Sequence, residues 1–342
     1  MKIIETALEG GKVITLMDAN IENIIDYHQK EKIVILTDET VFALHKNKFE
    51  GYSIITIDGT EKNKTQQTID GIINQLLEKD IDKSYMLVGV GGGVVTDMAG
   101  YVASVYKRGI KLGLVPTTIL GMTDAAIGGK NGVNVGVYKN MVGTTYRPQF
   151  ILYDFSFLQS LPKAEWVNGF AEIIKHACIK DAAMFDVLEK HTIDFYINNK
   201  EAIAKLIEDN VYLKMEVVKN DEHETGERYM LNFGHTFGHA IENLYKIPHG
   251  SAVSIGMVMA AKISEEINNF DSDAKNRLIK LLQQYELPFN FEIDKPQVLS
   301  LLKQDKKRVG DEINFVLLNT IGEAKVQKIS FVQLQDLLDQ TL

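Results

Sequence analysis

Residues 85–106 read YMLVGVGGGVVTDMAGYVASVY and decide the fold that the sequence predicts. The run Tyr85–Val90 is apolar and short, as in a buried strand, and Thr96–Tyr106 repeats apolar residues at helical spacing. Gly91–Gly93 join the two, and a glycine turn between strand and helix lets backbone amides approach a pyrophosphate. Because Thr96 stands where the last glycine of GxGxxG would be, the turn alone is a weak dinucleotide signal.

The first half of the chain repeats this alternation of strand and helix. Apolar runs at Lys32–Thr37, Tyr52–Ile57 and Lys111–Val115 predict further strands, and Gln66–Glu78 has a helical period. Such alternation favours a parallel sheet covered by helices, which binds nucleotides at the carboxyl ends of its strands. We therefore expect an α/β, Rossmann-like nucleotide-binding domain over residues 1–160.

Long helical patterns dominate the second half, where only Ile313–Leu318 and Ala324–Lys328 predict strands. The helical segments are Lys163–Lys180, Lys200–Asp221, His235–Tyr245, Ala252–Asn268 and Ala274–Gln284. We expect a mostly α-helical metal-binding domain over residues 161–342, with the boundary near residues 155–162.

Composition excludes several classes of protein. The chain has 342 residues and a net charge of −9, which argues against a nucleic-acid partner. Its single cysteine, Cys178, excludes an internal disulfide and fits a reducing cytoplasm. The N-terminus lacks the apolar core of a signal peptide, and no run approaches the roughly 18 apolar residues of a membrane span. We expect a cytoplasmic protein with no membrane partner.

Polar residues follow the predicted strands. Asp38 closes one strand, where it suits either a ribose hydroxyl or a helix N-cap. Asp97, in the first turn of the next helix, suits either the helix dipole or a cofactor. Thr117 and Thr118 follow another strand and suit either a nucleotide or a turn.

The segment 123–140, TDAAIGGKNGVNVGVYKN, places Asp124, Lys130, Lys139 and Asn140 on one glycine-rich connection. Two lysines among glycines at the end of an α/β sheet resemble an anion cradle, although the P-loop spacing is absent. Single lysines are usually solvated surface residues, but the density of polar groups here favours function.

Three histidines lie in residues 228–250, RYMLNFGHTFGHAIENLYKIPHG. His235 and His239 are four apart on a predicted helix and share one face, and His249 lies between Pro and Gly in a predicted loop. Imidazoles suit a divalent transition metal, although an isolated pair at this spacing often occurs by chance. Arg228 and Asn232 precede them at helical spacing and suit a charged, hydroxylated substrate.

A second helical segment, 168–178, carries Glu172 and Lys175 three residues apart among apolar neighbours. Burying a glutamate is costly unless it is paired or bound to metal. Two histidines and one carboxylate, with a fourth position open, are typical of a catalytic zinc site. A surface ion pair between Glu172 and Lys175 is the alternative.

Seven motifs follow one another along the chain: GGGVVTD, PTT, DAAIGGK, KN, AEIIKH, LNFGHTFGH and PHG. Together and in this order they resemble the 3-dehydroquinate synthases, over roughly residues 30 to 310. The resemblance implies a lyase of the shikimate pathway, in chorismate and aromatic amino acid biosynthesis. These enzymes convert 3-deoxy-D-arabino-heptulosonate 7-phosphate into 3-dehydroquinate and phosphate. They use catalytic NAD and one divalent metal, zinc or cobalt, for transient oxidation, phosphate β-elimination, reduction, ring opening and intramolecular aldol closure.

The resemblance also implies roles for individual residues. The metal ligands are Glu172, His235 and His249, which leaves His239 as a substrate contact. Catalytic roles fall to Lys130, Lys175, Arg228, Asn232 and His239. Further substrate contacts are Arg108, Asp124, Asn140, Lys214, and one of Lys306 and Lys307, between which the sequence does not choose. The NAD contacts are Asp38, Glu61, Lys64, Gly92, Gly93, Val94, Val95, Thr96, Asp97, Thr117, Thr118, Lys130, Lys139, Phe157, Leu158, Gln159 and Ser160.

Arg108 resembles an arginine that reaches a neighbouring subunit's phosphate site, so a homodimer is expected. The chain departs from the family pattern at Thr96, where glycine is usual and where we expect the threonine to cap the helix. It departs again at Ser160, where threonine is usual, and an extra residue precedes Glu61–Lys64.

Three alternative functions stay open at this stage. Other sugar phosphate cyclases, such as 2-deoxy-scyllo-inosose and 2-epi-5-epi-valiolone synthases, share NAD, metal and phosphate elimination. A metal-dependent polyol dehydrogenase would release NADH, but the lysine-containing loop Lys130–Lys139 argues against it. A non-catalytic metal-binding module leaves the phosphate-type residues unexplained.

Overall fold

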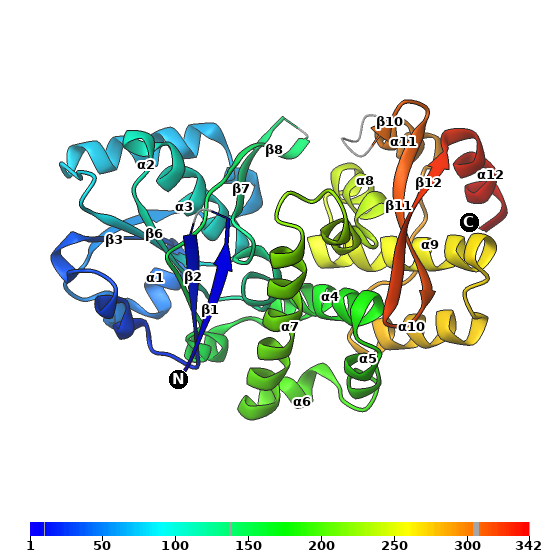
Figure 1. Cartoon of the computed structure of the whole chain (residues 1–342), viewed down its shortest axis with the longest axis horizontal. Coiled ribbons are helices and arrows are strands. Elements are labelled where there is room, and N and C mark those ends of the chain that lie inside the picture. The colour runs from blue at the N-terminus through cyan, green and yellow to red at the C-terminus, as the bar shows by residue number, and fades with distance from the viewer. Residues whose placement is uncertain (10, 137, 304–307, 342) are drawn as a thin grey trace. The chain divides into compact units, whose positions relative to one another are not determined.

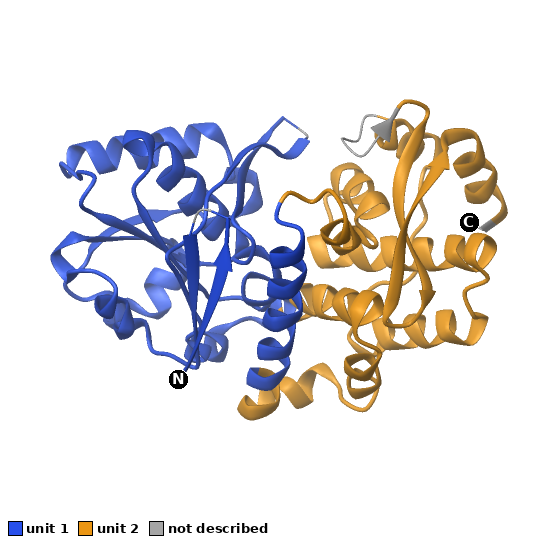
Figure 2. Cartoon of the chain, viewed as in Figure 1, with its two compact units in different colours: residues 1–165, 204–222 blue, residues 166–203, 223–342 orange. Residues whose placement is uncertain are grey.

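The computed structural model describes residues 1–342 apart from 10, 137, 304–307 and 342, and it divides into two compact units. Unit 1 comprises residues 1–165 and 204–222, and unit 2 comprises residues 166–203 and 223–342 (Figure 2). This division differs from the predicted boundary mainly in α7 (Lys200–Asn220), most of which belongs to unit 1.

Contacts with the start of the chain explain why α7 belongs largely to unit 1. The Thr15 hydroxyl donates to the sulfur of Met215 at 3.8 Å, and Lys2 forms an ion pair with Glu208. These partners are about 200 residues from α7 in sequence. No local pattern predicts such a contact, because it joins segments that only the tertiary structure brings together.

Unit 1 contains a seven-stranded sheet in the order β1-β2-β9-β6-β5-β3-β4, parallel except for the β1–β2 pair (Figure 1). Its strands are β1 (Lys2–Leu8), β2 (Gly11–Met17), β3 (Ile33–Asp38), β4 (Ser53–Ile57), β5 (Met86–Gly91), β6 (Lys111–Pro116) and β9 (Phe150–Leu152). The predicted parallel α/β sheet is confirmed. Strands β1, β2 and β9 were not predicted, and β9 is too short for a recognisable period.

The order of the strands reverses between β3 and β5. After β4 the chain returns to the other side of β3 and adds β5, β6 and β9 in that direction. Parallel sheets bind ligands where the strand order reverses, outside the carboxyl ends of the strands. Asp38 ends β3 and Gly91 ends β5, so both lie at this point.

The helices of unit 1 are α1 (Glu39–Leu44), α2 (Gln66–Glu78), α3 (Gly93–Val105) and most of α7. Short helical turns occupy Ile21–Asp26, Lys30–Lys32, Lys46–Phe49, Glu61–Asn63, Tyr106–Arg108, Gly121–Ala125 and Phe155–Ser160. Helix α3 packs closely on the sheet, because a Cβ on Gly89 would lie 2.6 Å from that of Ala99. It begins three residues earlier than predicted and has Gly92 as its N-cap.

The segment predicted as a glycine-rich connection is a β-hairpin. Strands β7 (Lys130–Val135) and β8 (Tyr138–Thr145) pair antiparallel, and β7 packs against α3. The side chain of Asn131 lies against Gly100 of α3, and its buried amide donates to the carbonyls of Gly129 at 2.8 Å and Tyr146 at 2.9 Å. Periodicity did not reveal the strands because glycines interrupt them.

Unit 2 is mostly helical, as predicted. Its helices are α4 (Lys163–Lys180), which starts at the end of unit 1, α5 (Ala182–Leu188), α6 (Ile193–Asn198), α8 (His235–Tyr245), α9 (His249–Asn268), α10 (Ser272–Gln284), α11 (Lys295–Leu302) and α12 (Phe331–Thr341), with a short turn at Glu227–Asn232. Strands β10 (Arg308–Val309), β11 (Glu312–Thr320) and β12 (Glu323–Ser330) form an antiparallel sheet. Apolar residues of α8, α9, α11, α12 and this sheet form one core.

None of the described helices combines the length and the apolar character that crossing a lipid bilayer requires.

We predict that Gly100→Ala destabilises the protein. A Cβ on Gly100 would lie 1.7 Å from the Asn131 side-chain oxygen, so the amide must move and lose buried hydrogen bonds. Each loss costs about 1–3 kcal/mol. The control is Gly71→Ala in α2, where an added Cβ would have nothing within 4 Å. That change should stabilise by about 0.5–1 kcal/mol. Chemical denaturation of both variants measures the difference, and equal effects contradict the Asn131 account.

Candidate functional site

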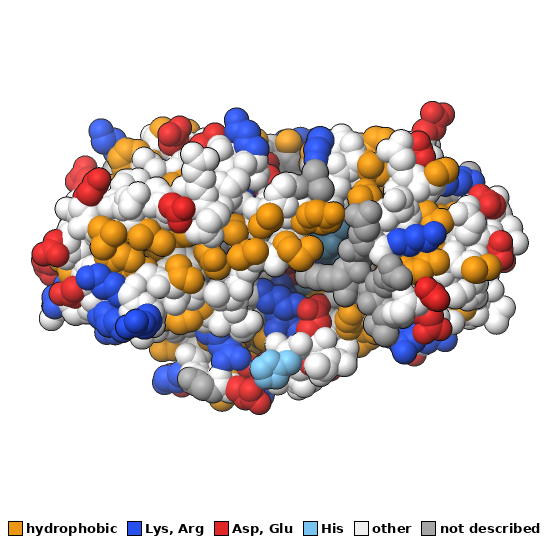
Figure 3. All heavy atoms as spheres, turned by 90° about the horizontal axis from the view of Figure 1, so that it is seen from above, with side chains coloured by type: hydrophobic (Ala, Val, Ile, Leu, Met, Phe, Trp, Pro, Cys, Tyr) orange, Lys and Arg blue, Asp and Glu red, His pale blue; other side chains and the backbone are white. Residues whose placement is uncertain are grey.

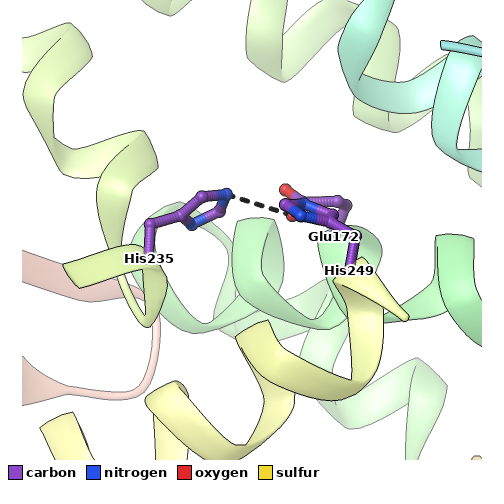
Figure 4. Close-up of side chains that lie close together, drawn as sticks. All are labelled: Glu172, His235 and His249. Atoms are coloured by element: carbon purple, nitrogen blue, oxygen red, sulfur yellow. Dashed lines mark hydrogen bonds and ion pairs between the residues drawn. The ribbon is translucent and has the colours of Figure 1, made fainter. Parts of the chain in front are cut away.

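Glu172, His235 and His249 come together in unit 2 with ligand atoms within 4.8 Å of one another (Figure 4). Glu172 lies on α4, His235 opens α8, and His249 opens α9. The Nε2 atoms of His235 and His249 lie 3.4 and 3.3 Å from the same oxygen, Oε1, of Glu172. Two imidazoles and one carboxylate around one point form the donor set that zinc and similar ions prefer.

Close helix packing places the two histidines. Gly234 precedes His235 with φ +75°, and a Cβ there would lie 2.8 Å from the carbonyl oxygen of Val253 in α9. A Cβ on Gly256 would lie 1.9 Å from the carbonyl oxygen of Gly234. Only glycine accommodates this approach, which brings the start of α8 against α9.

A second close contact ties α9 to α4. The Gly250 amide donates to the Asn168 side-chain oxygen at 2.6 Å, and a Cβ on Gly250 would lie 2.2 Å from the Asn168 carbonyl oxygen. Gly250 follows His249, and Asn168 lies one helical turn before Glu172. This contact therefore fixes His249 relative to Glu172. His249 is the first residue of α9, which corrects the predicted loop.

Glu172 and Lys175 form an ion pair at 2.5 Å, with 0% and 1% of their side chains exposed. The alternative of a surface ion pair is therefore wrong. A buried carboxylate costs several kcal/mol in desolvation unless positive groups compensate it. Lys175 and the imidazoles supply that compensation.

The neighbours of His249 change its proton affinity. Burial lowers the pKa of His249, but hydrogen bonds and charge from Glu172 and Glu242 outweigh this and raise the pKa to about 10. The Nδ1 of His249 lies 3.3 Å from Glu242 Oε2, and the Nδ1 of His235 lies 3.1 Å from the carbonyl oxygen of Phe233. Both partners accept hydrogen bonds, so each Nδ1 carries hydrogen and each Nε2 faces Glu172.

Three further predicted residues of unit 2 lie in the described part of the chain. The His239 ring lies 5.2 Å from His235 and 6.4 Å from His249, and His239 is outside the three-residue donor set. Arg228 is buried in the turn before α8. The amide of Asn232 donates to Glu224 at 2.8 Å and to the Tyr229 carbonyl at 3.1 Å.

In unit 1 the glycine turn opens α3 without a side-chain cap. A Cβ on Gly91 would lie 2.6 Å from Val95, so this glycine allows the tight turn. Thr96 lies inside α3, is buried, and donates to the Gly93 carbonyl at 3.0 Å, which corrects the expectation that it caps the helix. The amides of Gly93, Val94 and Val95 belong to the first turn, where a helix favours an anion.

Two hydroxyls follow β6. Thr118 accepts a hydrogen bond from the Gly121 amide at 3.0 Å, the turn role that the sequence left open. The Thr117 hydroxyl is buried and has no hydrogen-bond partner among the described residues. Buried polar groups are rarely left without a partner, so this hydroxyl fits a bound nucleotide.

Lys64 is buried and joins two other predicted site residues. It forms an ion pair with Asp97 and donates to Asn140 Oδ1 at 2.6 Å. Burial raises the pKa of the Asp97 carboxyl, against the opposing effect of Lys64. Glu61 pairs with Lys139 at 3.5 Å, and the Asn134 amide donates to Glu61 at 2.8 Å.

Lys214 on α7 donates to the side chain of Asp124 at 2.6 Å and to its carbonyl at 2.5 Å. The two residues are 90 positions apart in sequence, and both were predicted as substrate contacts. Lys130 lies exposed at the start of β7.

Asp38 caps α1 by accepting a hydrogen bond from the Val41 amide at 2.8 Å. In the turn Phe155–Ser160, Phe157 and Leu158 are buried and Gln159 is exposed, while the Ser160 hydroxyl lies 2.7 Å from His45 Nε2. Arg108 is exposed just beyond α3, with φ +64°. Lys306 and Lys307 lie outside the described residues.

Three residues that organise the site were not predicted from the sequence. Asn168 and Glu242 contact the His249 segment, and Asn134 joins Glu61 to the hairpin, where its side chain accepts from the Asn140 amide at 3.0 Å. A carboxylate on the apolar helix α8 was a usable signal for Glu242. The other two depend on contacts between segments distant in sequence.

A Rossmann-like unit followed by a helical unit with a His₂Glu donor set defines a class of nucleotide- and metal-dependent enzymes. Two protein-family models match this chain and agree with that class. The model "3-dehydroquinate synthase N-terminal" matches residues 54–168, and "3-dehydroquinate synthase C-terminal" matches residues 169–308. A 3-dehydroquinate synthase from Saccharolobus solfataricus is 40% identical over 296 residues, 84% of each chain. The chain belongs to the 3-dehydroquinate synthase family.

Solved structures share this fold. The 2-epi-5-epi-valiolone synthase of Streptomyces hygroscopicus, with NAD⁺ and Zn²⁺ bound, is 25% identical with a TM-score of 0.87, covering 100% of this chain and 98% of that one. A 2-deoxy-scyllo-inosose synthase complexed with carbaglucose-6-phosphate, NAD⁺ and Co²⁺ also has a TM-score of 0.87, at 23% identity and 100% coverage of both chains.

We predict that metal affinity rises with pH. Because the pKa of His249 is raised to about 10, a proton occupies this ligand below that pH and competes with the metal. Removing one competing proton strengthens apparent zinc binding about tenfold per pH unit between about pH 7 and pH 9. Zinc titration against a chelator, corrected for the chelator's own protonation, measures this slope. An affinity that does not change over this range contradicts the assignment of the proton to His249.

Proposed function

We propose that this chain converts 3-deoxy-D-arabino-heptulosonate 7-phosphate into 3-dehydroquinate and inorganic phosphate, with NAD and one divalent metal ion, zinc or cobalt. The observation that carries the proposal is the group of Glu172, His235 and His249, built around a fully buried carboxylate, in a chain of this family. When bound, the ion supplies Lewis acidity toward substrate hydroxyls and NAD supplies a hydride acceptor.

Glu172, His235 and His249 hold the metal ion in this proposal, and Lys175 balances the buried charge of Glu172. The Lys175 ammonium contacts Glu172 at 2.5 Å, so beside a bound ion it would be the group that positions a substrate hydroxyl and its proton. Arg228 is a buried cation and Asn232 a donor and acceptor close to it in sequence. These two residues suit a carboxylate and a hydroxyl of the substrate.

NAD binds at the carboxyl end of the sheet in unit 1. The amides of Gly92–Val95 and the positive end of α3 hold its pyrophosphate, and the Thr117 hydroxyl gains a partner. One carboxylate oxygen of Asp38 caps α1, and the other can accept a hydrogen bond from a ribose hydroxyl. Glu61, Lys64, Asp97 and Lys139 form the charged network beside this turn, and residues 157–160 complete the proposed contacts.

The phosphate of the substrate needs cations that bind it and let it leave. Lys130 and Lys214 are the proposed cations, with Asp124 holding Lys214 in place and Asn140 adding a neutral contact. Lysines suit this role because they bind phosphate as point charges without the bidentate grip of arginine.

The rival cyclases share the fold, but Arg228 and Asn232 favour a carboxylated substrate, and relatives 40% identical are 3-dehydroquinate synthases. A polyol dehydrogenase leaves the lysines unexplained.

Purified protein with zinc and NAD should release phosphate from the heptulosonate phosphate without net NADH, because the oxidation is reversed within each turnover. Phosphate assay and absorbance at the NADH band measure both quantities. Glucose 6-phosphate and sedoheptulose 7-phosphate are the comparison substrates. Steady NADH accumulation supports the dehydrogenase, and preference for a comparison substrate supports a rival cyclase.

In the same assay His249→Ala should lose phosphate release by at least about a hundredfold, as loss of a metal ligand predicts. The matched control, His223→Ala, changes an exposed histidine of the same unit and should retain activity. Equal activities of the two variants contradict the metal assignment.

We also propose that the protein is a cytoplasmic homodimer. Apolar side chains gather on the part of unit 1 visible in Figure 3, and Val135, Tyr138, Met141 and Val142 of the hairpin are exposed. Strand β8 pairs with β7 alone among the described strands, so it offers an open edge. A second copy of the chain would cover this edge, and Arg108, the expected contact with a neighbouring subunit, lies exposed just beyond α3. The buried free thiol of Cys178 is compatible with the cytoplasm.

We predict that Met141→Lys weakens self-association, since it puts a charge into the proposed contact. Leu77→Lys on α2 is the control, because Leu77 is an exposed apolar residue outside the hairpin. Sedimentation over a range of concentrations measures the dimer constant. A monomeric wild type, or equal constants for both variants, counts against this interface.

A further inference from the structure

The two histidines of the Glu172–His235–His249 cluster have different hydrogen-bond partners on the Nδ1 atoms, which point away from Glu172. The Nδ1 of His235 faces a neutral backbone carbonyl, that of Phe233. The Nδ1 of His249 faces the carboxylate of Glu242. A carbonyl orients an imidazole, whereas a carboxylate both orients it and raises its basicity. The cluster is therefore asymmetric, and Glu242 is the source of the asymmetry.

Glu242 is placed for this role by its helix. It lies on α8 seven residues after His235, which is about two turns, so both residues occupy one side of the helix. Only 4% of its surface is exposed, and its helical neighbours Ala240 and Ile241 belong to the apolar core of unit 2. A carboxylate in such a position carries a desolvation cost that its contact with His249 offsets in part.

His249 needs such a partner more than His235 does. It is the first residue of α9 and follows Pro248, so the preceding chain gives its ring no helical neighbour. Its side chain is 25% exposed, against 11% for His235, which leaves more room for rotation. A hydrogen bond on Nδ1 keeps Nε2 directed at Glu172.

We propose that Glu242 is a positioning residue for metal binding, which fixes His249 by accepting its Nδ1 hydrogen. The inference rests on the proposed function, because it assigns the cluster to a divalent metal. Helix α8 then supplies one ligand, His235, and the group that orients another, His249. Packing of α8 against α9 and metal affinity are thereby coupled through one side chain.

The test compares Glu242→Ala and Glu242→Gln in the full chain. Zinc affinity is measured by chelator competition, and the visible absorption of the cobalt-loaded protein reports ligand geometry. Glu242→Ala should weaken zinc binding roughly 10- to 100-fold, as loss of such a partner does elsewhere. Glu242→Gln should lose less, because its amide oxygen still accepts the Nδ1 hydrogen. Both should bind NAD as the wild type does.

Glu266→Gln is the matched control, since it removes the same charge from an exposed position on α9. Wild-type zinc affinity and an unchanged cobalt spectrum in Glu242→Ala would overturn the proposal. If that variant does not fold, Glu242→Met decides, because it keeps a similar length and apolar packing but has no acceptor for the Nδ1 hydrogen, and wild-type zinc affinity there overturns the proposal equally. A wild type that binds no divalent metal would instead refute the proposed function, so the two failures are distinguishable.

Discussion

The carboxylate of Glu172 has no exposed surface, and it faces the Nε2 atoms of two histidines and the ammonium group of Lys175. A buried anion is unstable without such partners, because its desolvation costs several kcal/mol. The three helices that carry these groups must therefore meet at one point. The arrangement of unit 2 around α4, α8 and α9 follows from this requirement, and so does the capacity of the unit for a divalent cation.

Glycines make that meeting possible. Gly234 and Gly256 let α8 and α9 touch through their backbones, and Gly250 lets α9 touch α4 beside Asn168. A methyl group at any of these positions would separate helices whose side chains must converge within a few ångström. The same principle operates in unit 1, where Gly89 and Gly100 admit α3 to the sheet and Asn131 to α3. In unit 2 these are contacts with the backbone of the neighbouring helix, whereas in unit 1 the glycines make room for the side chains of Ala99 and Asn131.

The two units handle charge in different ways. In unit 1, Lys64 pairs with Asp97 and Lys139 pairs with Glu61 beside the N-terminus of α3. Charges of both signs at this position suit a cofactor that carries phosphates and ribose hydroxyls. Unit 2 gathers imidazoles around one carboxylate, which suits a divalent transition-metal ion such as zinc. The reaction of the family needs both, since a nucleotide and a Lewis acid act on one substrate. A net charge of −9 spread over the chain is compatible with locally cationic positions such as Arg228 and Lys214.

Local sequence determined a large part of this protein. The periods of Gln66–Glu78, Lys163–Lys180 and His235–Tyr245 predicted helices with the bounds that the structure has, because these signals depend on neighbours within one or two turns. The strand and glycine turn at residues 85–93 predicted the parallel sheet, and ordered motifs indicated the family. Other features were wrong or missed: the hairpin at 130–145, the helical start at His249, the interior place of Thr96, and the residues Asn168 and Glu242. Glycines hid the period of the hairpin strands, and Thr96 lies inside α3 because the helix starts earlier than its period indicates. Asn168 depends on a partner far away in the chain, since it meets Gly250 82 residues later. The sequence by itself determined which groups are present and which helices and strands carry them. Tertiary structure decided which of them face one another, because burial and backbone contact between distant segments leave no periodic trace in the chain.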